Sequence, residues 1–293
     1  MQQFLQQVVS GLASGGIYAS LALALVLIYR STEVINFAQG EMATFTTYVA
    51  WQIIHWGVPY WAAFFLTLGV AFVFGVAIER VVIRPFEHGP VLTVVIVTIG
   101  LLVILNGLNG WIWTAEIKAF PSAFPTRPIN VAGVAFSLQD IGIILVSLLA
   151  VLCLWAFFRF TKVGLAMRAA AVNPDSARLT GVRVGWMLAL GWGLASMLGA
   201  LSGLMVAPIV FLDPNMMQVV LIYAFAAAVL GGLQSPVGAV VGGLILGVML
   251  NLLGTYVHAI TPELRLPVAL AVLLGVLLVK PSGLFGRAVV RKV

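Results

Sequence analysis

The strongest constraint on the fold is a series of long apolar stretches that follow one another along almost the whole chain. A helix needs roughly 20 mostly apolar residues to cross the hydrocarbon core of a membrane. By that rule we expect spans near residues 5–29, 35–55, 61–83, 91–114, 139–160, 186–212, 217–231, 238–257 and 264–280. The stretch 217–231 is short, so it is either a full span or a half-span. The sequence therefore predicts an all-α polytopic membrane protein, a bundle of about eight or nine transmembrane helices.

Composition supports this prediction. Of the 293 residues, 62% are hydrophobic and 8% are charged, whereas a soluble domain carries roughly 25% charged residues. The polar side chains are too few to cover so much apolar surface in water. We interpret residues 1–293 as a single transmembrane domain. The net charge of +6 is interpreted as basic loops facing the cytoplasm, and no nucleic-acid partner is expected.

The basic residues predict the orientation of the spans. With these spans, the basic residues on one side of the membrane are Arg30, Arg80, Arg84, Arg159, Lys162, Arg168, Arg178, Arg183, Lys280, Arg287, Arg291 and Lys292. The other side carries only Lys118, Arg127 and Arg265. Because Lys and Arg are enriched in cytoplasmic loops, we assign the first side to the cytoplasm. An odd number of spans then puts the N-terminus outside and the C-terminus in the cytoplasm.

Small residues recur every fourth position along two of the spans. The residues of these stripes are Gly191, Ala195, Gly199 and Gly203 in one span, and Gly243 and Gly247 in another. In lipid, helices associate through close backbone approach, which small side chains permit. The stripes are therefore predicted to be helix-packing surfaces. Packing inside the subunit and packing between subunits both remain open.

The sequence offers no recognisable enzyme site. His55, His88 and His258 are far apart and lack the spacing of zinc ligands, so no metal site and no cofactor are expected. The chain has no GxxxxGK[ST] phosphate-binding loop and no GxSxG nucleophile elbow. The remaining classes are a transporter, a channel or a membrane scaffold.

A polar segment at the second span is the first candidate functional region. The candidate residues for a translocation pathway are Asn36, Gln39, Glu41, Thr44 and Tyr48. A carboxylate at membrane depth costs at least ~2.5 kcal/mol, so it usually faces protein or water. Glu41 is interpreted either as part of the pathway or as a structural group that holds helices together or lies at the membrane surface.

The loop 161–185 between two spans is the second candidate region. The pattern predicts two short helices joined at Asn173–Pro174, with Asn173 as the N-cap and Pro174 at the first helical position. Gly181 supplies a helix stop. A structured loop that mixes apolar side chains with Arg168 and Arg178 suits the docking of a rigid partner protein. The alternative is an interfacial helix bound to anionic lipid head groups.

Three patches carry a resemblance to a known family: INFAQGEM at 35–42, GLAMRAAAVNPDSARLTGV at 164–182 and AAAVLGGLQSPVGAVVGG at 226–243. In these patches the chain resembles the permease subunits of branched-chain amino-acid ABC importers of the LivH type. The second patch matches the cytoplasmic coupling segment that binds the ATPase subunit, although no Glu precedes Ala169–Ala171. The coupling residues that the resemblance implies are Gly164, Leu165, Arg168, Ala169, Ala170, Asn173, Pro174, Ala177, Arg178 and Gly181.

The resemblance also implies partners and a mechanism. The expected partners are a second related permease subunit, two cytoplasmic ATPase subunits that hydrolyse ATP, a periplasmic substrate-binding protein and membrane lipid. The expected location is the bacterial inner membrane, and the expected mechanism is alternating access. One alternative is an ABC permease for urea or short amides. Another is an ion-coupled secondary transporter, for which Glu41 is the only strong acidic candidate, and a membrane-embedded enzyme is a third.

Overall fold

The computed structural model describes residues 2–87, 89–125, 128–131, 134–257 and 259–286. Its α-helices are α1 (Gln2–Thr32), α2 (Gln39–His55), α3 (Tyr60–Ile78), α4 (Val91–Trp113), α5 (Leu138–Phe160), α6 (Lys162–Val172), α7 (Pro174–Leu179), α8 (Val184–Val210), α9 (Met216–Gly231), α10 (Pro236–Tyr256) and α11 (Arg265–Val279). A π-helical turn (Glu79–Ile83) and a 3-10 turn (Arg84–Phe86) extend α3, and a 3-10 turn (Pro262–Leu264) precedes α11. Two short strands, β1 (Pro128–Val131) and β2 (Val134–Ser137), complete the described elements.

The predicted all-helical bundle is confirmed, but the predicted number of spans is too large by the criterion of length. Within the described residues, seven helices are long and apolar enough to cross a membrane: α1, α3 with its extension, α4, α5, α8, α10 and α11 with its preceding turn. The expected spans 35–55 and 217–231 correspond to α2 and α9, which have 17 and 16 residues. These two helices are shorter than the roughly 20 residues that a perpendicular crossing needs.

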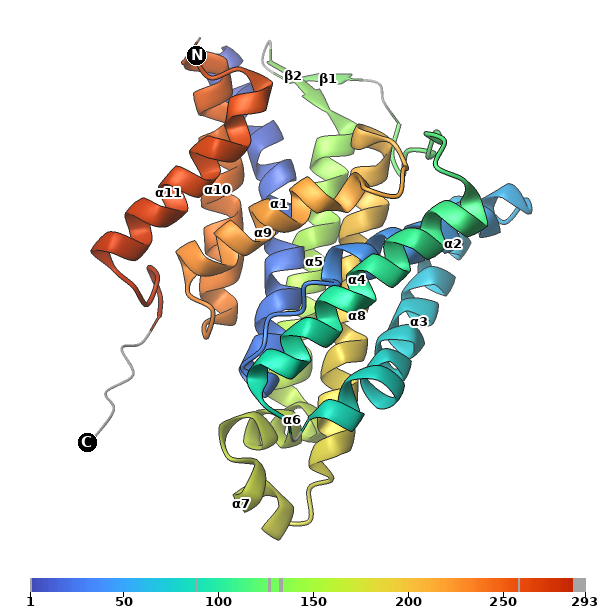
Figure 1. Ribbon diagram of the computed structural model, residues 1–293. Helices are drawn as coiled ribbons and strands as arrows, with labels where there is room; N and C mark the ends of the chain where they lie inside the picture. Colours follow the sequence, from blue (N-terminus) through green and yellow to red (C-terminus); the bar gives the residue numbers. More distant parts are fainter. Residues whose placement is uncertain (1, 88, 126–127, 132–133, 258, 287–293) are drawn as a thin grey trace.

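Helices α1 and α8 form the centre of the bundle. In their most apolar windows 78% and 72% of the residues are buried, against 22% in α4 and in α5 and 11% in α11. α1 packs against α10, α8 and α5, and α8 also packs against α3 (Figure 1). The long helices thus divide into central ones that face protein and peripheral ones with largely exposed surfaces.

The stripes of small residues lie between helices of this same chain. Gly243 and Gly247 face α1, and a Cβ atom added to Gly243 would lie 2.5 Å from the Cα of Ala19. Gly199 and Gly203 face α2, and a Cβ atom on Gly199 would lie 2.7 Å from the side-chain nitrogen of Gln39. At Gly243 the neighbouring atoms are backbone, so α1 and α10 pack backbone to backbone, as is usual in lipid, whereas at Gly199 the neighbour is the end of the Gln39 side chain.

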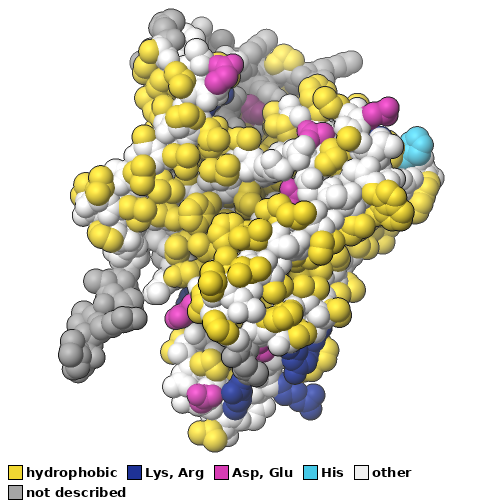
Figure 2. Space-filling view, in the orientation of Figure 1, with side chains coloured by type: hydrophobic (Ala, Val, Ile, Leu, Met, Phe, Trp, Pro, Cys, Tyr) yellow, Lys and Arg dark blue, Asp and Glu magenta, His cyan; other side chains and the backbone are white. Residues whose placement is uncertain are grey.

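The two ends of the bundle carry different structures. Strands β1 and β2 pair antiparallel, with Pro128 opposite Ser137, and they lie at the same end as the start of α1 (Figure 1). We call this the hairpin end. Helices α6 and α7 protrude at the opposite end, which we call the α6–α7 end. Figure 2 shows that the Lys and Arg side chains on the visible face gather mainly at the α6–α7 end.

Candidate functional site

The start of α2 is a buried polar segment that is tied to α8. The side-chain oxygen of Asn36 accepts a hydrogen bond from the Ala38 backbone N–H at 3.0 Å, and its nitrogen donates to the Gln39 side-chain oxygen at 3.1 Å. Gln39 in turn donates to the Ala195 carbonyl oxygen at 2.9 Å. Because Asn36 closes a turn in this way, α2 begins at Gln39, four residues later than the predicted span. Asn36 and Gln39 are thus placed at a helix–helix contact.

Glu41 lies beside a second polar group that comes from α4 and the start of α9. The side chain of Asn106 on α4 donates to Glu41 Oε2 at 3.4 Å and to the Asn215 side-chain oxygen at 2.9 Å. Gln218 donates to the same Asn215 oxygen at 2.8 Å. The Asp213 carboxylate accepts from the Asn215 backbone N–H at 2.7 Å. We call Glu41, Asn106, Asp213, Asn215 and Gln218 the α2–α4–α9 polar cluster.

Two further buried polar side chains border this region without hydrogen-bond partners among the described residues. They are the hydroxyl of Tyr48 and both side-chain amide atoms of Asn109. Tyr48 stacks on Trp113, with ring centroids 5.0 Å apart. A buried polar atom without a partner loses its hydration and gains nothing in return. They lie on α2 and α4, the helices that carry Glu41 and Asn106, and this favours a functional role for this part of the bundle.

The predicted pathway residues do not all share one surface. The hydroxyl of Thr44 is buried and donates to the Gly40 carbonyl of its own helix at 3.2 Å. Tyr48, Asn36 and Gln39 are also buried. Among the five predicted residues, Glu41 is the one that belongs to the α2–α4–α9 polar cluster, through the hydrogen bond from Asn106. The sequence prediction missed Asn106, Asn109, Asp213, Asn215 and Gln218. Two asparagines inside the apolar run ILNGLNG at 104–110 were the available signal for α4.

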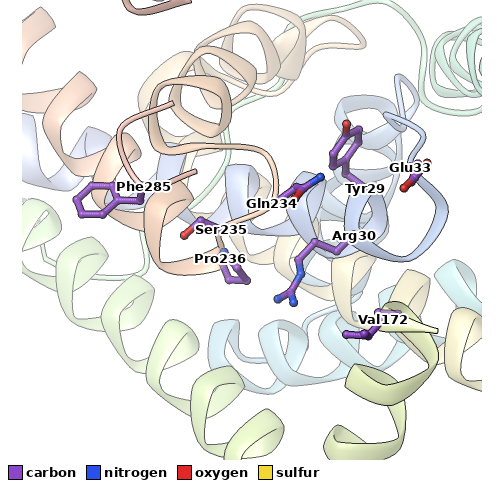
Figure 3. A pocket seen from close by; sticks show the side chains of 9 residues that line it. Tyr29, Arg30, Glu33, Val172, Gln234, Ser235, Pro236 and Phe285 are labelled. Carbon is purple, nitrogen blue, oxygen red and sulfur yellow. The ribbon is translucent and has the colours of Figure 1, made fainter. Parts of the chain in front are cut away.

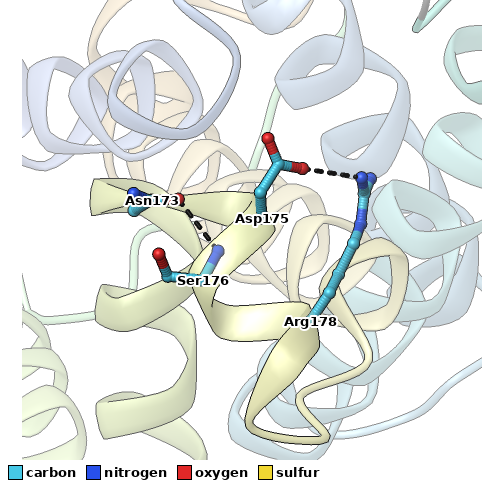
Figure 4. A network of polar contacts seen from close by, with 4 residues as sticks. All are labelled: Asn173, Asp175, Ser176 and Arg178. Atoms are coloured by element: carbon cyan, nitrogen blue, oxygen red, sulfur yellow. Dashed lines mark hydrogen bonds and ion pairs between the residues drawn. The ribbon is translucent and has the colours of Figure 1, made fainter.

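The second region folds as predicted into two short helices. Asn173 caps α7: its side-chain oxygen accepts the Ser176 backbone N–H at 2.9 Å, and Pro174 is the first helical residue. Arg178 and Asp175 form an exposed ion pair at 3.1 Å, as Figure 4 shows. Gly181 ends the segment with a φ of +84°, a left-handed conformation that favours glycine.

The ten predicted coupling residues differ in exposure. Leu165, Ala169, Asn173, Pro174, Arg178 and Gly181 are exposed, Arg168 is half-buried, and Gly164, Ala170 and Ala177 are buried. Ala170 and Ala177 pack with Val184 and Leu188 in a small apolar cluster. A Cβ atom on Gly164 would lie 2.7 Å from the Cα of Phe158. The three buried residues therefore hold α6 and α7 against the bundle, and a partner protein cannot touch their side chains without rearrangement.

A polar cavity of about 490 Å³ opens beside this segment. Tyr29, Arg30 and Glu33 at the end of α1 line it, together with the end of α6, Phe285 and the turn at 234–236 between α9 and α10. Figure 3 shows the side chains of these elements around the cavity. The turn between α9 and α10 therefore lies next to α6.

The described residues contain no group of three or more His, Cys, Asp or Glu side chains that could hold a metal ion. Taken together, the helical bundle, the buried polar cluster and the protruding helix pair define a multi-pass membrane transport protein.

Comparison with known proteins identifies the family. The chain matches the family described as "Branched-chain amino acid transport system / permease component" over residues 7–277, and it belongs to that family. The high-affinity branched-chain amino acid transport system permease protein LivH of Salmonella typhimurium is 33% identical, over 99% of this chain and 98% of that protein. The corresponding protein BraD of Pseudomonas aeruginosa is also 33% identical over the same shares. A probable branched-chain amino acid permease LivH of Methanocaldococcus jannaschii is 30% identical over 91% of this chain and 87% of its own length.

The expected resemblance is thus confirmed. The family is that of a membrane-spanning permease component and not of an enzyme.

Proposed function

We propose that this chain is the permease subunit of a bacterial ABC importer that carries branched-chain amino acids across the inner membrane. The observation that carries the proposal is the match along almost the whole chain to permeases named for branched-chain amino acid transport. The expected partners are a second related permease, two cytoplasmic ATPase subunits and a periplasmic binding protein. The protein moves its substrate by alternating access, since ATP-driven closure of the ATPases stabilises one of two conformations.

We assign the α6–α7 end to the cytoplasm. Arg80 lies over the ring of Trp186, 3.9 Å from its centroid, and Arg84 approaches Gly185, so two basic residues of the extension of α3 lie beside the start of α8. Enrichment of Lys and Arg on one side is typical of the cytoplasmic side. The N-terminus and the hairpin end then lie outside, where the binding protein delivers the amino acid.

The exposed surface of α6 and α7 is the proposed ATPase-docking surface. It offers two exposed leucines, Leu165 and Leu179, beside the cationic Arg178. The Asn173 cap fixes the start of α7, and the buried Ala170 and Ala177 attach the helix pair to the start of α8, which limits bending of this surface. Stiffness matters because a loop that merely bends under load does not transmit a movement to the membrane helices.

The proposal is tested by purifying the tagged chain in mild detergent and identifying the subunits that accompany it. We expect two ATPases and a second permease. The reconstituted complex with its binding protein should take up radiolabelled leucine, isoleucine and valine when ATP is supplied. Uptake of urea in place of these amino acids, or ATP-independent uptake driven by a proton gradient, would contradict the proposal.

A further inference from the structure

The α2–α4–α9 polar cluster reaches the outer surface of the subunit, where the apolar helix α4 meets the connection between α8 and α9. Asn215 and Gln218 are exposed, and Asn106 and Asp213 are partly exposed. Asn106 lies about two thirds of the way along the apolar helix α4. Figure 2 shows that the face of the subunit over α4 and α9 is otherwise mostly hydrophobic.

The exposed residues next to the polar cluster on α4 and α9 are apolar. Val103 and Ile104 flank Asn106 on α4, and Val219 and Ile222 follow Gln218 on α9. Side chains of this kind suit contact with lipid. Polar and ionisable side chains at membrane depth instead face a protein or a water-filled route. The cluster therefore marks a strip of this surface that lipid does not cover.

The chemistry of the cluster combines two carboxylates with three side-chain amides. The ion pairs among the described residues are Arg80–Glu79 and Arg178–Asp175, so neither Glu41 nor Asp213 has a basic partner there. Two carboxyl groups without a basic partner can accept hydrogen bonds from a cationic group. Asn106 already donates to Glu41 and Asn215, but the Asn215 amide nitrogen and the second N–H of Gln218 are not used in the hydrogen bonds of the cluster, so they can donate to an anionic group next to that cation.

An α-amino acid carries these two groups on adjacent atoms, an ammonium and a carboxylate. We propose that the α2–α4–α9 polar cluster binds this zwitterionic head group during transport, with Glu41 and Asp213 facing the ammonium and the amides facing the carboxylate. The apolar side chain of the substrate then lies along exposed residues such as Ile104 and Val219. This inference rests on the proposed function, which it deepens by naming the residues that contact the substrate. Neutral substrates such as urea do not require the two carboxylates.

Cysteine accessibility tests the route. The chain has a single cysteine, so Cys153→Ser provides a background in which Asn106→Cys and Gln218→Cys are introduced one at a time. Ile96→Cys and Ile222→Cys are the matched controls, because both residues are exposed on the same helices and neither is placed in the proposed contact surface. In the complete complex we expect a charged, membrane-impermeant thiol reagent to label positions 106 and 218 at least tenfold faster than the controls. Leucine delivered by the binding protein should slow that labelling.

Two results would overturn the inference. Labelling of positions 106 and 218 as slow as that of the controls would put the cluster against lipid or dry protein. Fast labelling that is insensitive to the transported amino acid would remove the cluster from substrate contact. Leucine uptake by the unsubstituted complex is measured in parallel, and its absence would count against the proposed function and not against the cluster.

A charge-removing variant tests the head-group contact separately. Glu41→Gln keeps the size and hydrogen-bonding capacity of the side chain, so we expect assembly to persist while leucine uptake falls tenfold or more. The control Glu87→Gln changes a carboxylate in the connection between α3 and α4. Uptake by Glu41→Gln equal to that of the control would contradict a role for this carboxylate.

Discussion

Glu41 is the residue at which burial and charge conflict most strongly. Only 2% of its surface is exposed although it lies in the first turn of α2, and burial deprives a charged carboxylate of its hydration. The hydrogen bond from Asn106 is long, at 3.4 Å, so it offsets that cost weakly. A residue that destabilises its own fold in this way is typical of a functional site.

This conflict predicts that Glu41 and Gln39 respond differently to substitution. Glu41→Gln should leave the thermal stability of the purified subunit unchanged or raise it, because a buried charge is removed. Gln39→Leu should lower it, because the Ala195 carbonyl and Asn36 both lose a bonded partner, at about 1–3 kcal/mol for a buried polar group. Thermal unfolding in detergent measures both. A marked loss of stability in Glu41→Gln would show instead that the carboxylate holds the helices together.

Among the helices, α1 and α10 illustrate how small residues permit close packing. Gly11 and Gly15 on α1 meet Val248 and Leu244 on α10, and added Cβ atoms would lie 2.7 Å and 2.9 Å from the Cα atoms of these partners. On α10, Gly247 faces Gly11 and Gly15, and Gly243 faces the backbone of Ala19. No shift of a flexible side chain relieves such a clash, because the neighbouring atoms belong to the backbone.

We therefore expect Gly243→Val to destabilise the subunit by at least the 1–3 kcal/mol typical of overpacking. Gly69→Val is the matched control: Gly69 also lies within a helix, and nothing lies within 4 Å of a Cβ atom added there. Thermal unfolding and the yield of folded protein from membranes provide the comparison. Equal effects of the two substitutions would mean that α1 and α10 are not in close contact.

The exposed side of α7 gives a prediction for partner binding. Leu179 is 90% exposed, and Leu179→Asp should abolish co-purification of the ATPase subunits while the permease still inserts and folds. Ile117→Asp is the control, since Ile117 is also exposed but lies in the connection between α4 and β1. ATPase subunits that remain bound to the Leu179→Asp protein would exclude α7 from the docking surface.

The helices could be predicted from the sequence to within a few residues, because an apolar run in lipid has few alternatives to a helix. The roles of Asn173 as an N-cap and of Gly181 as a helix stop could also be predicted, because helix capping depends on residues that are close together in the sequence. The strands β1 and β2 were not predicted. The polar cluster was missed because it joins Asn106 to Glu41 and Asn215, 65 and 109 residues away along the chain, and one helix does not reveal which neighbour its polar residue will meet.

The molecule as a whole is asymmetric from end to end. The hairpin end carries the start of α1 and the paired strands, and the α6–α7 end carries the helix pair with most of the visible Lys and Arg side chains (Figures 1 and 2). The proposed importer mechanism depends on this asymmetry, because ATP is available on one side of the membrane only. If the orientation were reversed, α6 and α7 could not meet a cytoplasmic ATPase.

The sidedness of Ser176 tests this account most directly. Ser176 is exposed within α7, and Ser176→Cys in the Cys153→Ser background puts a single thiol in the proposed docking surface. A membrane-impermeant maleimide should label it in inside-out vesicles, leave it unlabelled in right-side-out vesicles, and label it more slowly once the ATPase subunits are bound. Labelling in intact right-side-out vesicles would put α7 outside the cell and contradict the importer assignment.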